Sequence, residues 1–518
     1  MKKNSKTQDQ CTVRERNGQL VFAVNSEILL PENAPVRLTS AQLEGLDYRE
    51  LYRAYSPKGR KSKVDPRVMF KVMVYGYQCG IYSSRKLEEA CHYRIDFMWL
   101  LGDEQVPDHA TFARFRTGRC VEAVEDLFYQ YVKLLEKQGE TDHEVVFIDG
   151  TKLESSAGRY TFCWRGSIEK YLEKTREKVL QLTGIKKLCL LREYLEQQRE
   201  SIVFIHGKGK RQSAEQRRWE ELNELSKRWE GYENSLNIMG ESRNSYSKTD
   251  PDATFMRMKD DHMRNGQLKP AYNVQIAVNS EYITGIDVFS DRNDYGTLVP
   301  FLKNTQQHHG SRYKEVTADA GYESLENYLF LERNGQVSLI KPTNYDARKR
   351  KKFKKQIGRI ENMTYDSEED CFICAEGRTL RLRQETTELQ NGHFITTAHY
   401  RCENCKDCPR RSACCQSKDP EKPKKITLNK TFWERRAQSQ SNITSERGIC
   451  LRMCRSIQVE GTFALLKTDF GFRRFLTRGK QNIRTELFFL AMAFNLKKLW
   501  MKREKGRLKT HLSKVRVA

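Results

Sequence analysis

The amino-acid sequence predicts an α/β protein, with a mixed β-sheet flanked by helices and an all-helical region before it. Apolar residues recur with helical spacing between residues 65 and 135, whereas Val145 to Ile148 form a continuous β-prone run typical of a buried strand. More segments with strand-like patterns lie after residue 250. Two stretches of different composition interrupt the series of strands. We therefore interpret the sequence as one α/β core opened by two insertions, at residues 168–245 and 345–430.

The helical region is expected to end in an arginine-rich helix. Asp65-Pro66 supplies one helix start, and Pro107-Asp108 supplies another before a segment that contains Arg114 and Arg116. Short helices joined by tight turns, with arginines on the last one, suit a helix-turn-helix-like domain that reads DNA. A small packing domain with solvated arginines fits the same pattern equally well.

Acidic residues close two of the predicted strands. The run from Val145 to Ile148 ends in Asp149, and the run from Glu315 to Ala318 ends in Asp319. The patterns also predict strands over 272–278, 282–289 and 337–340, and helices over 323–333 and 445–467. In the last helix, the side expected to border the core carries Ile449, Met453, Ile457 and Phe463.

Asp149, Asp319 and the helical Glu460 form a candidate metal site. A charge at the end of a buried strand is costly unless it is paired or binds a metal. Three converging carboxylates would bind Mg²⁺ or Mn²⁺, and two such ions support phosphoryl transfer. Any one such acid is more often a turn cap. The acids that spacing leaves as competitors are Asp287, Asp291 and Asp294.

The net charge indicates a polyanionic partner. The 518 residues include 92 Lys+Arg and 68 Asp+Glu, a formal charge of +24. Nucleic acid is the first candidate and an anionic membrane surface the second, although an ordinary basic enzyme remains compatible. Two stretches, 341–359 and 497–516, each carry nine Lys/Arg against one acid, and such stretches bind phosphates without reading sequence.

The cellular compartment is expected to be the cytoplasm. No apolar segment of signal-peptide type follows the basic N-terminus, and the run from Leu487 to Leu496 is shorter than the ~20 residues that span a bilayer. Thiols stay reduced in that compartment, so the 15 Cys are not expected to form a disulfide framework.

Seven cysteines crowd into the second insertion with the spacing of a zinc site. Cys371 and Cys374 form one CxxC pair, and Cys402, Cys405 and Cys408 form two overlapping ones before Cys414-Cys415. The four ligands remain open: Cys371 and Cys374 with two of the middle three, or the middle three with Cys414. His393 and His399 are further candidates, and reduced thiols without metal are the alternative. A structural role is expected, because no water-activating His or Glu motif accompanies the cysteines.

Longer segments carry a family resemblance over most of the chain. They are DPRVMFKVMVYGYQCGIYSSRKLEEA, PDHATFARFR, FIDGTKLESSAGRYTFCWR, SYSKTDPDATFMRMKDD, YNVQIAV, TADAGYESLENY and RSIQVEGTFALLKTDFGFRRFLTRGK. In this order they resemble DDE-type bacterial insertion-sequence transposases. The resemblance implies a helical DNA-binding domain at 1–140, an RNase H-like catalytic domain at 143–500 and a basic tail at 501–518. The core would be interrupted by a helical insertion at 168–245 and a zinc-ribbon-like, basic and cysteine-rich insertion at 345–430.

The resemblance also implies roles for individual residues. Asp149, Asp319 and Glu460 would form the catalytic triad that binds Mg²⁺ or Mn²⁺, and the family pattern favours Asp319 over Asp287 and Asp294. Related transposases often carry Arg before the catalytic Glu and Lys after it. Lys467 matches, whereas Arg455 lies one position further from Glu460 than the pattern expects. The residues that follow the first catalytic strand and would contact DNA ends are Lys152, Arg159, Trp164 and Arg165.

The implied activity is DNA transposition. The protein would bind terminal inverted repeats in double-stranded DNA, cut strands with a divalent metal and transfer the 3′-OH ends to target DNA, as a homodimer that pairs two ends. A related RNase H-like nuclease, or a domesticated transposase that cuts without joining, is the enzymatic alternative. A non-catalytic zinc-containing DNA-binding protein is the other alternative.

Overall fold

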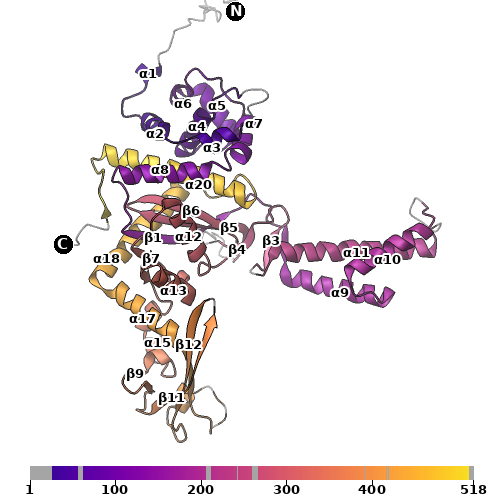
Figure 1. Ribbon diagram of the computed structural model, residues 1–518, viewed down its shortest axis with the longest axis vertical. Coiled ribbons are helices and arrows are strands. Elements are labelled where there is room, and N and C mark those ends of the chain that lie inside the picture. Colours follow the sequence, from indigo (N-terminus) through magenta and orange to yellow (C-terminus); the bar gives the residue numbers. More distant parts are fainter. Residues whose placement is uncertain are drawn as a thin grey trace, which may run out of the picture.

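The computed structural model describes residues 26–55, 62–205, 212–241, 243–258, 266–390, 392–415, 417, 419 and 421–512. Parts of two predicted regions, the first 25 residues of the helical region and the last six of the basic tail, lie outside these residues. Figure 1 shows a central sheet with a helical region at one end, a long helical arm projecting sideways and a second β-rich region at the opposite end.

The N-terminal region consists of short helices, as the sequence predicts. Asp65 accepts a hydrogen bond from the Arg67 N–H at 2.7 Å, and Asp108 accepts one from the Thr111 N–H at 2.6 Å, so both predicted starts are real caps. The elements are α1 Ser26–Leu29, α2 Pro35–Glu44, α3 Arg49–Arg53, α4 Pro66–Gln78, α5 Ser84–Tyr93, α6 Ile95–Leu101, α7 His109–Arg114, the π-helix η2 Phe115–Arg119 and α8 Val124–Lys137.

The central sheet is mixed and has six strands. Its order is β4-β5-β1-β7-β8, with β6 also paired to β5; β1 runs antiparallel to β5 and parallel to β7, and β7 runs parallel to β8. The strands are β1 Val145–Glu154, β4 Thr254–Arg257, β5 Leu268–Asn279, β6 Tyr282–Phe289, β7 Glu315–Ala318 and β8 Val337–Ile340. The predicted turn between β5 and β6 is confirmed, with Ser280 and Glu281 both at positive φ.

Alternating residues of β1 bury themselves against different helices. Val145 and Phe147 belong to the core shared with α8 and α20 Lys480–Glu504, whereas Val146 and Ile148 pack with α12 Leu298–His309 and α13 Leu325–Arg333. Helices therefore cover both faces of the sheet. This explains the continuous apolar run that predicted a buried strand.

The end of β1 differs from the prediction. Asp149 lies in the middle of the strand, because antiparallel pairing with β5 continues from Asp149 opposite Ile276 to Glu154 opposite Ala271. Polar residues after Asp149 therefore do not end the strand. The partner strand supplies the backbone hydrogen bonds that hold it extended.

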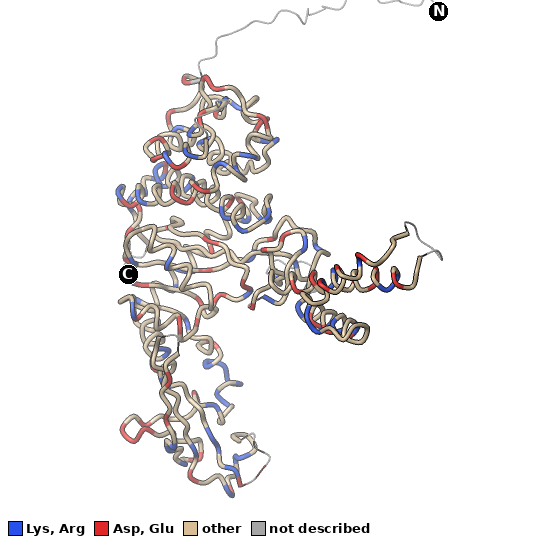
Figure 2. The backbone as a smooth tube through the Cα atoms, turned by 45° about the vertical axis from the view of Figure 1, so that its right-hand side comes forward, with Lys and Arg blue, Asp and Glu red and all other residues tan. Residues whose placement is uncertain are grey.

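The first insertion is a helical arm with its own core. Its elements are β2 Phe162–Trp164, α9 Arg165–Thr183, α10 Leu188–Ser201, α11 Ala214–Met239 and β3 Ser245–Ser247. Leu172, Leu191, Leu222 and Trp229 are among the buried residues that hold the helices together. Charges of both signs line the arm (Figure 2), and ion pairs such as Lys178–Glu221 and Arg192–Glu230 link neighbouring helices.

The second insertion contains an antiparallel sheet that the sequence patterns did not reveal. Its five strands follow the order β13-β12-β11-β10-β9, and β11 and β12 form a long hairpin. The elements are α14 Tyr345–Lys349, α15 Lys351–Lys354, the 3₁₀-helix η4 Ile360–Asn362, β9 Thr364–Asp366, β10 Cys371–Ile373, β11 Thr379–Gln390, β12 His393–Cys402, α16 Arg411–Cys414 and β13 Lys425–Asn429.

The chain returns to the core through helices α17 Lys430–Thr444, α18 Glu446–Arg455, the π-helix η5 Ser456–Glu460 and α19 Gly461–Thr468. The prediction of which side of this helix borders the core is wrong. Ile449 and Met453 on α18 and Ile457 on η5 are 45%, 53% and 62% exposed. The buried side instead carries Gly448, Leu451 and Cys454. Gly448 packs so closely that a Cβ there would collide with the backbone of Asn442, and sequence spacing does not show such a contact.

Helix α20 joins the N-terminal helices to the sheet. The Phe489 ring lies 5.5 Å from the rings of both Phe70 and Tyr77 on α4, while the Asn495 amide bonds to the Ile283 backbone on β6 at 2.8 Å in both directions. The helical region and the central sheet thus share one hydrophobic core. Within the described residues, no helix is both long and apolar enough to cross a membrane.

A buried ion pair fixes the end of α20. Lys502, which the sequence places in the basic tail, is 2% exposed and lies 3.0 Å from Glu140, whose side chain is equally buried. Burial alone would raise the pKa of Glu140, but hydrogen bonds from Lys502, the Lys509 N–H and the Tyr282 hydroxyl hold it below the usual value. Lys502 is therefore a structural cation rather than a phosphate ligand.

We predict that Lys502→Met lowers the free energy of unfolding by about 3–5 kcal/mol, because it leaves the Glu140 carboxylate buried without its cation. Urea denaturation followed by circular dichroism measures the change. Lys505→Met, at an exposed position one residue beyond α20, is the matched control. Equal midpoints for the two variants would contradict the assignment.

Candidate active site

Asp149 and Asp319 come from neighbouring parallel strands. Phe147 on β1 pairs with Thr317 on β7, so the next residues on the same face, Asp149 and Asp319, continue that register. Asp149 is buried and accepts a hydrogen bond from the Gly150 N–H at 2.8 Å. Asp319 follows β7 directly and accepts one from the Gly321 N–H at 2.8 Å, where it caps the 3₁₀-helix η3 Ala320–Tyr322.

Arg455 connects the third acid to the first. Its guanidinium lies 3.3 Å from Asp149 Oδ2 through Nη1 and 3.7 Å from Glu460 Oε1 through Nη2. Glu460 ends η5, and its side chain is 60% exposed and accepts a hydrogen bond from the Ser456 hydroxyl at 3.0 Å. The structure therefore brings Asp149, Asp319 and Glu460 to one region, with Arg455 between two of them.

A π-helix explains the unusual spacing of Arg455. An α-helix places residues four apart on one side, whereas a π-turn spans five and occurs mostly as a local bulge at functional sites. Arg455 lies five residues before Glu460, and the intervening turn, η5, is a π-helix. The wider turn keeps the two side chains facing each other despite the extra residue that made the sequence match uncertain.

Tyr322 lies among the acids of this region. Its hydroxyl is fully buried and donates a hydrogen bond to Gln275 Oε1. Burial raises the Tyr322 pKa well above its usual value, and the charges of Asp294, Asp149 and Asp319 raise it further, against the opposite effect of Arg455. Asp294, which the sequence left as a competitor, thus borders the same site rather than replacing Asp319.

Asp287 has a different environment. Burial raises its pKa, and it forms an ion pair with Arg484 of α20 at a distance of 3.0 Å. It therefore belongs to the contact between β6 and α20.

Two regions of the chain match models of known protein families. Residues 373–500 match the model of a transposase DDE domain, and residues 24–118 match that of a transposase domain (DUF772). Together these matches support a DDE-type insertion-sequence transposase. The first match covers Arg455, Glu460 and Lys467, and the second covers Arg114 and Arg116. No curated protein and no solved structure gave a match.

The acids of this DNA transposase fit a divalent cation chemically. Transposases of the DDE family generally use divalent metal, and carboxylate oxygens are the ligands that Mg²⁺ and Mn²⁺ prefer. Asp319 and Asp294 form no ion pair with a described Lys or Arg. In the arrangement of the described residues, however, no three His, Cys, Asp or Glu side chains lie close enough together to hold a metal ion.

The residues predicted to contact DNA fall into two groups. Arg114 is exposed on α7, and Lys152 on β1, Trp164 on β2 and Lys467 on α19 are partly exposed. Arg116 is instead 6% exposed and donates a hydrogen bond to the Tyr82 carbonyl at 2.7 Å, so its guanidinium is used within the fold.

Arg165 is also used within the chain. It donates to the Arg243 carbonyl at 3.1 Å and to the Gly240 carbonyl, and these contacts tie the start of α9 to the segment after α11. The sequence predicted that Arg165 contacts DNA, because it follows the strand that carries Asp149. The structure shows that it fastens the arm.

Basic residues of the second insertion lie near helix α18. The guanidinium of Arg452, on α18, lies 5.3 Å from the centre of the Tyr345 ring on α14, and the Lys349 ammonium lies 4.1 Å from the same ring. The exposed side chains beyond this contact include Arg350, Lys351 and Lys352. Sequence alone did not reveal that this basic stretch contacts Arg452 on α18 through Tyr345.

Four of the candidate zinc ligands gather at one end of the insertion sheet. Burial raises the Cys402 pKa to about 12, and contact with Cys405 and the nearby Cys374 act in the same direction. Burial also raises the Cys414 pKa, and the nearby Cys374 and Cys405 raise it further. The Cys405 sulfur accepts a hydrogen bond from the Lys424 N–H at 3.3 Å. Cys371 is buried beside Asp366 and Arg381 instead.

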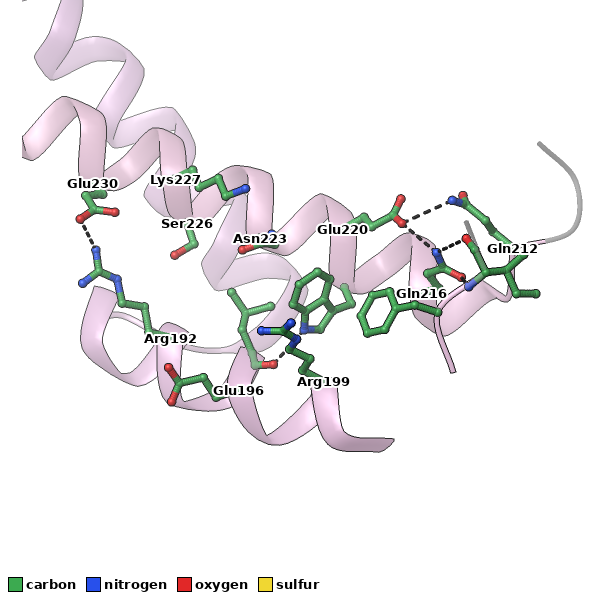
Figure 3. A pocket seen from close by; sticks show the side chains of 14 residues that line it. Arg192, Glu196, Arg199, Gln212, Gln216, Glu220, Asn223, Ser226, Lys227 and Glu230 are labelled. Atoms are coloured by element: carbon green, nitrogen blue, oxygen red, sulfur yellow. Dashed lines mark hydrogen bonds and ion pairs between the residues drawn. The ribbon is translucent and has the colours of Figure 1, made fainter. Parts of the chain in front are cut away.

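The helical arm contains a pocket of about 950 Å³ between α10 and α11 (Figure 3). Several of its polar side chains bond to one another or to the backbone, as Arg192 does to Glu230 and Trp219 to the Leu195 carbonyl. None of the candidate catalytic residues lines it.

We predict that Arg455→Ala destabilises the metal-free transposase by about 1–3 kcal/mol, because Asp149 and Glu460 lose the cation between them. Denaturation in the presence of EDTA measures this cost. Arg447→Ala is the control on the same helix: its more exposed pair with Glu315 is expected to contribute less than about 1 kcal/mol. A cost for Arg455→Ala no larger than that of the control would contradict the bridging role.

Proposed function

We propose that this transposase binds terminal inverted repeats, cuts DNA strands there and joins the resulting 3′-OH ends to target DNA. The observation that carries the proposal is that Asp149 and Asp319 each lie two residues beyond the last β1–β7 pair, Phe147 with Thr317, while Arg455 links Asp149 to Glu460. A mixed sheet with helices on both faces supports an RNase H-like core.

Asp149, Asp319 and Glu460 would hold the divalent ions. Bound there, such ions activate an attacking oxygen and stabilise the leaving one during phosphoryl transfer. The chain itself would position the acids. Strand β1 carries Asp149, Asp319 directly follows β7, and Glu460 ends η5. Rigid placement of this kind accounts for much of the rate in phosphoryl transfer.

DNA phosphates are proposed to lie along the exposed cations near this site. Lys467 lies two turns beyond Glu460, and Lys349 to Lys352 border α18 through the Tyr345 contact. Lys152, Arg159 and Trp164 extend this surface toward the arm, and Arg114 lies on the N-terminal helices. Such contacts bind strongly, and their affinity falls steeply with salt.

Two further properties belong to the proposal. A homodimer would pair two DNA ends, as the family resemblance implies. In the second insertion, Cys374, Cys402, Cys405 and Cys414 would hold a structural Zn²⁺ in a zinc-ribbon-like arrangement, because the thiols of Cys402 and Cys414 both lie near Cys374 and Cys405, whereas Cys371 lies beside Asp366 and Arg381.

We predict that Asp149→Ala, Asp319→Ala and Glu460→Ala each reduce DNA strand cutting by about 10³-fold or more, while binding of inverted-repeat DNA stays within a few fold. Supercoiled-plasmid nicking and gel-shift assays measure the two activities. Glu326→Ala, at an exposed acid on α13, is the matched control. Normal cutting by any triad variant would remove that residue from the active site.

Products of the same assay separate the alternatives. Cutting without joined products would favour a nuclease or a domesticated transposase. Inverted-repeat binding without metal-dependent nicking would favour a non-catalytic DNA-binding protein.

We predict about one zinc per chain in purified protein, lost in the Cys374→Ser/Cys402→Ser double variant but retained in Cys371→Ser, because only the first two thiols share the proposed site. Inductively coupled plasma mass spectrometry provides the measurement, with exposed Cys189→Ser as a second control. Absence of zinc from the wild-type protein would disprove this part of the proposal.

A further inference from the structure

The loop between α19 and α20 carries positive charge to which the proposed function gives no role. Residues 471–480 contain no acid and four cations, Arg473, Arg474, Arg478 and Lys480. The three arginines, which we call the arginine surface, are exposed. Like charges held together on a short loop repel one another unless an anion lies beside them.

Buried groups fix the shape of this loop. Phe472 and Phe475 are 2% and 1% exposed, and their ring centres lie 5.5 Å apart. The Gly479 N–H donates a hydrogen bond at 3.1 Å to Asp250, which is 0% exposed. The loop is therefore anchored from inside, while the arginines between these anchors stay at the surface.

Hydrogen bonds to neutral groups orient the arginine surface. Arg474 and Arg478 donate to backbone carbonyls and a hydroxyl of residues 155–157, the segment that follows β1, at 3.0–3.4 Å. Arg473 donates to the Lys467 carbonyl of α19 at 3.3 Å. Because these acceptors carry no net charge, the bonds hold the guanidiniums in place without cancelling their charge.

Within the described part of the chain, no carboxylate forms an ion pair with the arginine surface. Glu154 directly precedes the segment that the arginines hold, but its carboxylate pairs with Arg159 at 3.6 Å and with Lys269 at 3.1 Å. A guanidinium has five N–H donors, so the carbonyl bonds leave others for an anion. The arrangement suits phosphate, which arginine binds through several N–H groups at once.

An exposed aromatic ring lies on the adjoining segment. The Thr161 N–H donates to the Gly158 carbonyl at 3.4 Å and closes a turn that carries Tyr160. Tyr160 is 83% exposed, and its side chain forms no ring contact or hydrogen bond with another described residue. The turn begins directly after Ala157, whose carbonyl accepts a hydrogen bond from Arg474 at 3.2 Å. The ring therefore lies three residues from a contact of the arginine surface.

Cations beside an exposed ring fit a single DNA strand better than a duplex. Guanidiniums bind the backbone phosphates of either form. An aromatic ring stacks on the face of a base, and a duplex covers the faces of its internal bases with neighbouring bases. An acidic protein would satisfy the cations but would bring no flat partner for the ring.

We propose that the arginine surface binds the phosphates of a single-stranded stretch of DNA, with one base stacked on Tyr160. The inference rests on the proposed transposase function and adds to it a site for an unpaired strand. The bond from Arg473 to the Lys467 carbonyl joins this surface to α19, which follows Glu460 directly. A bound strand would therefore lie beside the helix that continues from the third acid.

The test measures DNA binding by fluorescence anisotropy, with full-length protein and no added divalent metal, so that cutting does not affect the readout. The probes are labelled oligothymidylate and a labelled duplex of arbitrary sequence. Tyr160→Ala is expected to weaken oligothymidylate binding by about 5–100-fold and duplex binding by less than about twofold, because only an unpaired base stacks on the ring. Tyr160→Phe keeps the ring and is expected to bind as the wild type does. Tyr171→Ala, at an exposed ring on α9 of the arm, is the matched control.

A second variant tests the cations. Arg473→Gln/Arg478→Gln is expected to lower the slope of log affinity against log salt concentration for oligothymidylate by about 1.4, because each phosphate contact on a single strand contributes about 0.7. Arg192→Gln/Arg228→Gln, whose charges already pair with acids of the arm, is the control and is expected to keep the wild-type slope. Circular dichroism verifies that all variants are folded.

The outcomes separate this inference from the proposed function. Selective loss of oligothymidylate binding in Tyr160→Ala, its recovery in Tyr160→Phe and a smaller salt slope in the arginine variant support it. Wild-type oligothymidylate binding by Tyr160→Ala, or a wild-type slope in the arginine variant, overturns it, and metal-dependent plasmid nicking by the same protein would leave the proposed function standing. Loss of self-association in Tyr160→Ala with unchanged DNA affinity also overturns it, because the ring would then contact a second copy of the chain. A wild-type protein that neither binds nor cuts DNA overturns both.

Discussion

Repulsion among closely placed carboxylates is the constraint on which the rest of the site depends. Asp149 lies on β1, Asp319 directly follows the neighbouring β7, and Asp294 lies beside both segments. Negative charges in such a place persist only if cations or fixed dipoles oppose them. Arg455 supplies a cation to Asp149, and buried amides supply dipoles to Asp294. A divalent ion would complete the compensation, and the same ion is what the chemistry requires.

The remainder of the fold keeps this costly arrangement rigid. The parallel register of β1 and β7 sets the positions of two acids, and the close packing of Gly448 against α17 sets the position of the helix that carries Arg455. Helix α20 contacts both the sheet and the N-terminal helices through Phe489 and Asn495. The N-terminal helices and the sheet therefore share one packed core.

The sequence predicts the sheet better than the site. The strand at 337–340 and the turn at 279–281 follow from apolar runs and turn residues, because both signals are local. Sequence patterns nominate the triad acids, but only the family resemblance favours Asp319 over its competitors and assigns a role to Lys467. Asp294 remained an undecided competitor, because its role depends on contacts with β5 and Gly321, which are distant in sequence.

Other differences also have a physical origin. Arg116 looks like a DNA contact in sequence but is buried against the Tyr82 carbonyl, and Lys502 looks like part of a tail but neutralises Glu140. Helical periodicity assigned Ile457 to the core-facing side, whereas the structure leaves it exposed on a π-helix. In each case a single tertiary contact or one extra residue in a turn reversed the expectation from local pattern.

The central claim is that the acids of β1 and β7 hold a divalent cation. Anomalous scattering from crystals of the protein soaked in Mn²⁺ tests it most directly. The account predicts an anomalous peak at the segments that carry Asp149 and Asp319. An empty site, at Mn²⁺ concentrations that support DNA cutting in solution, would contradict it.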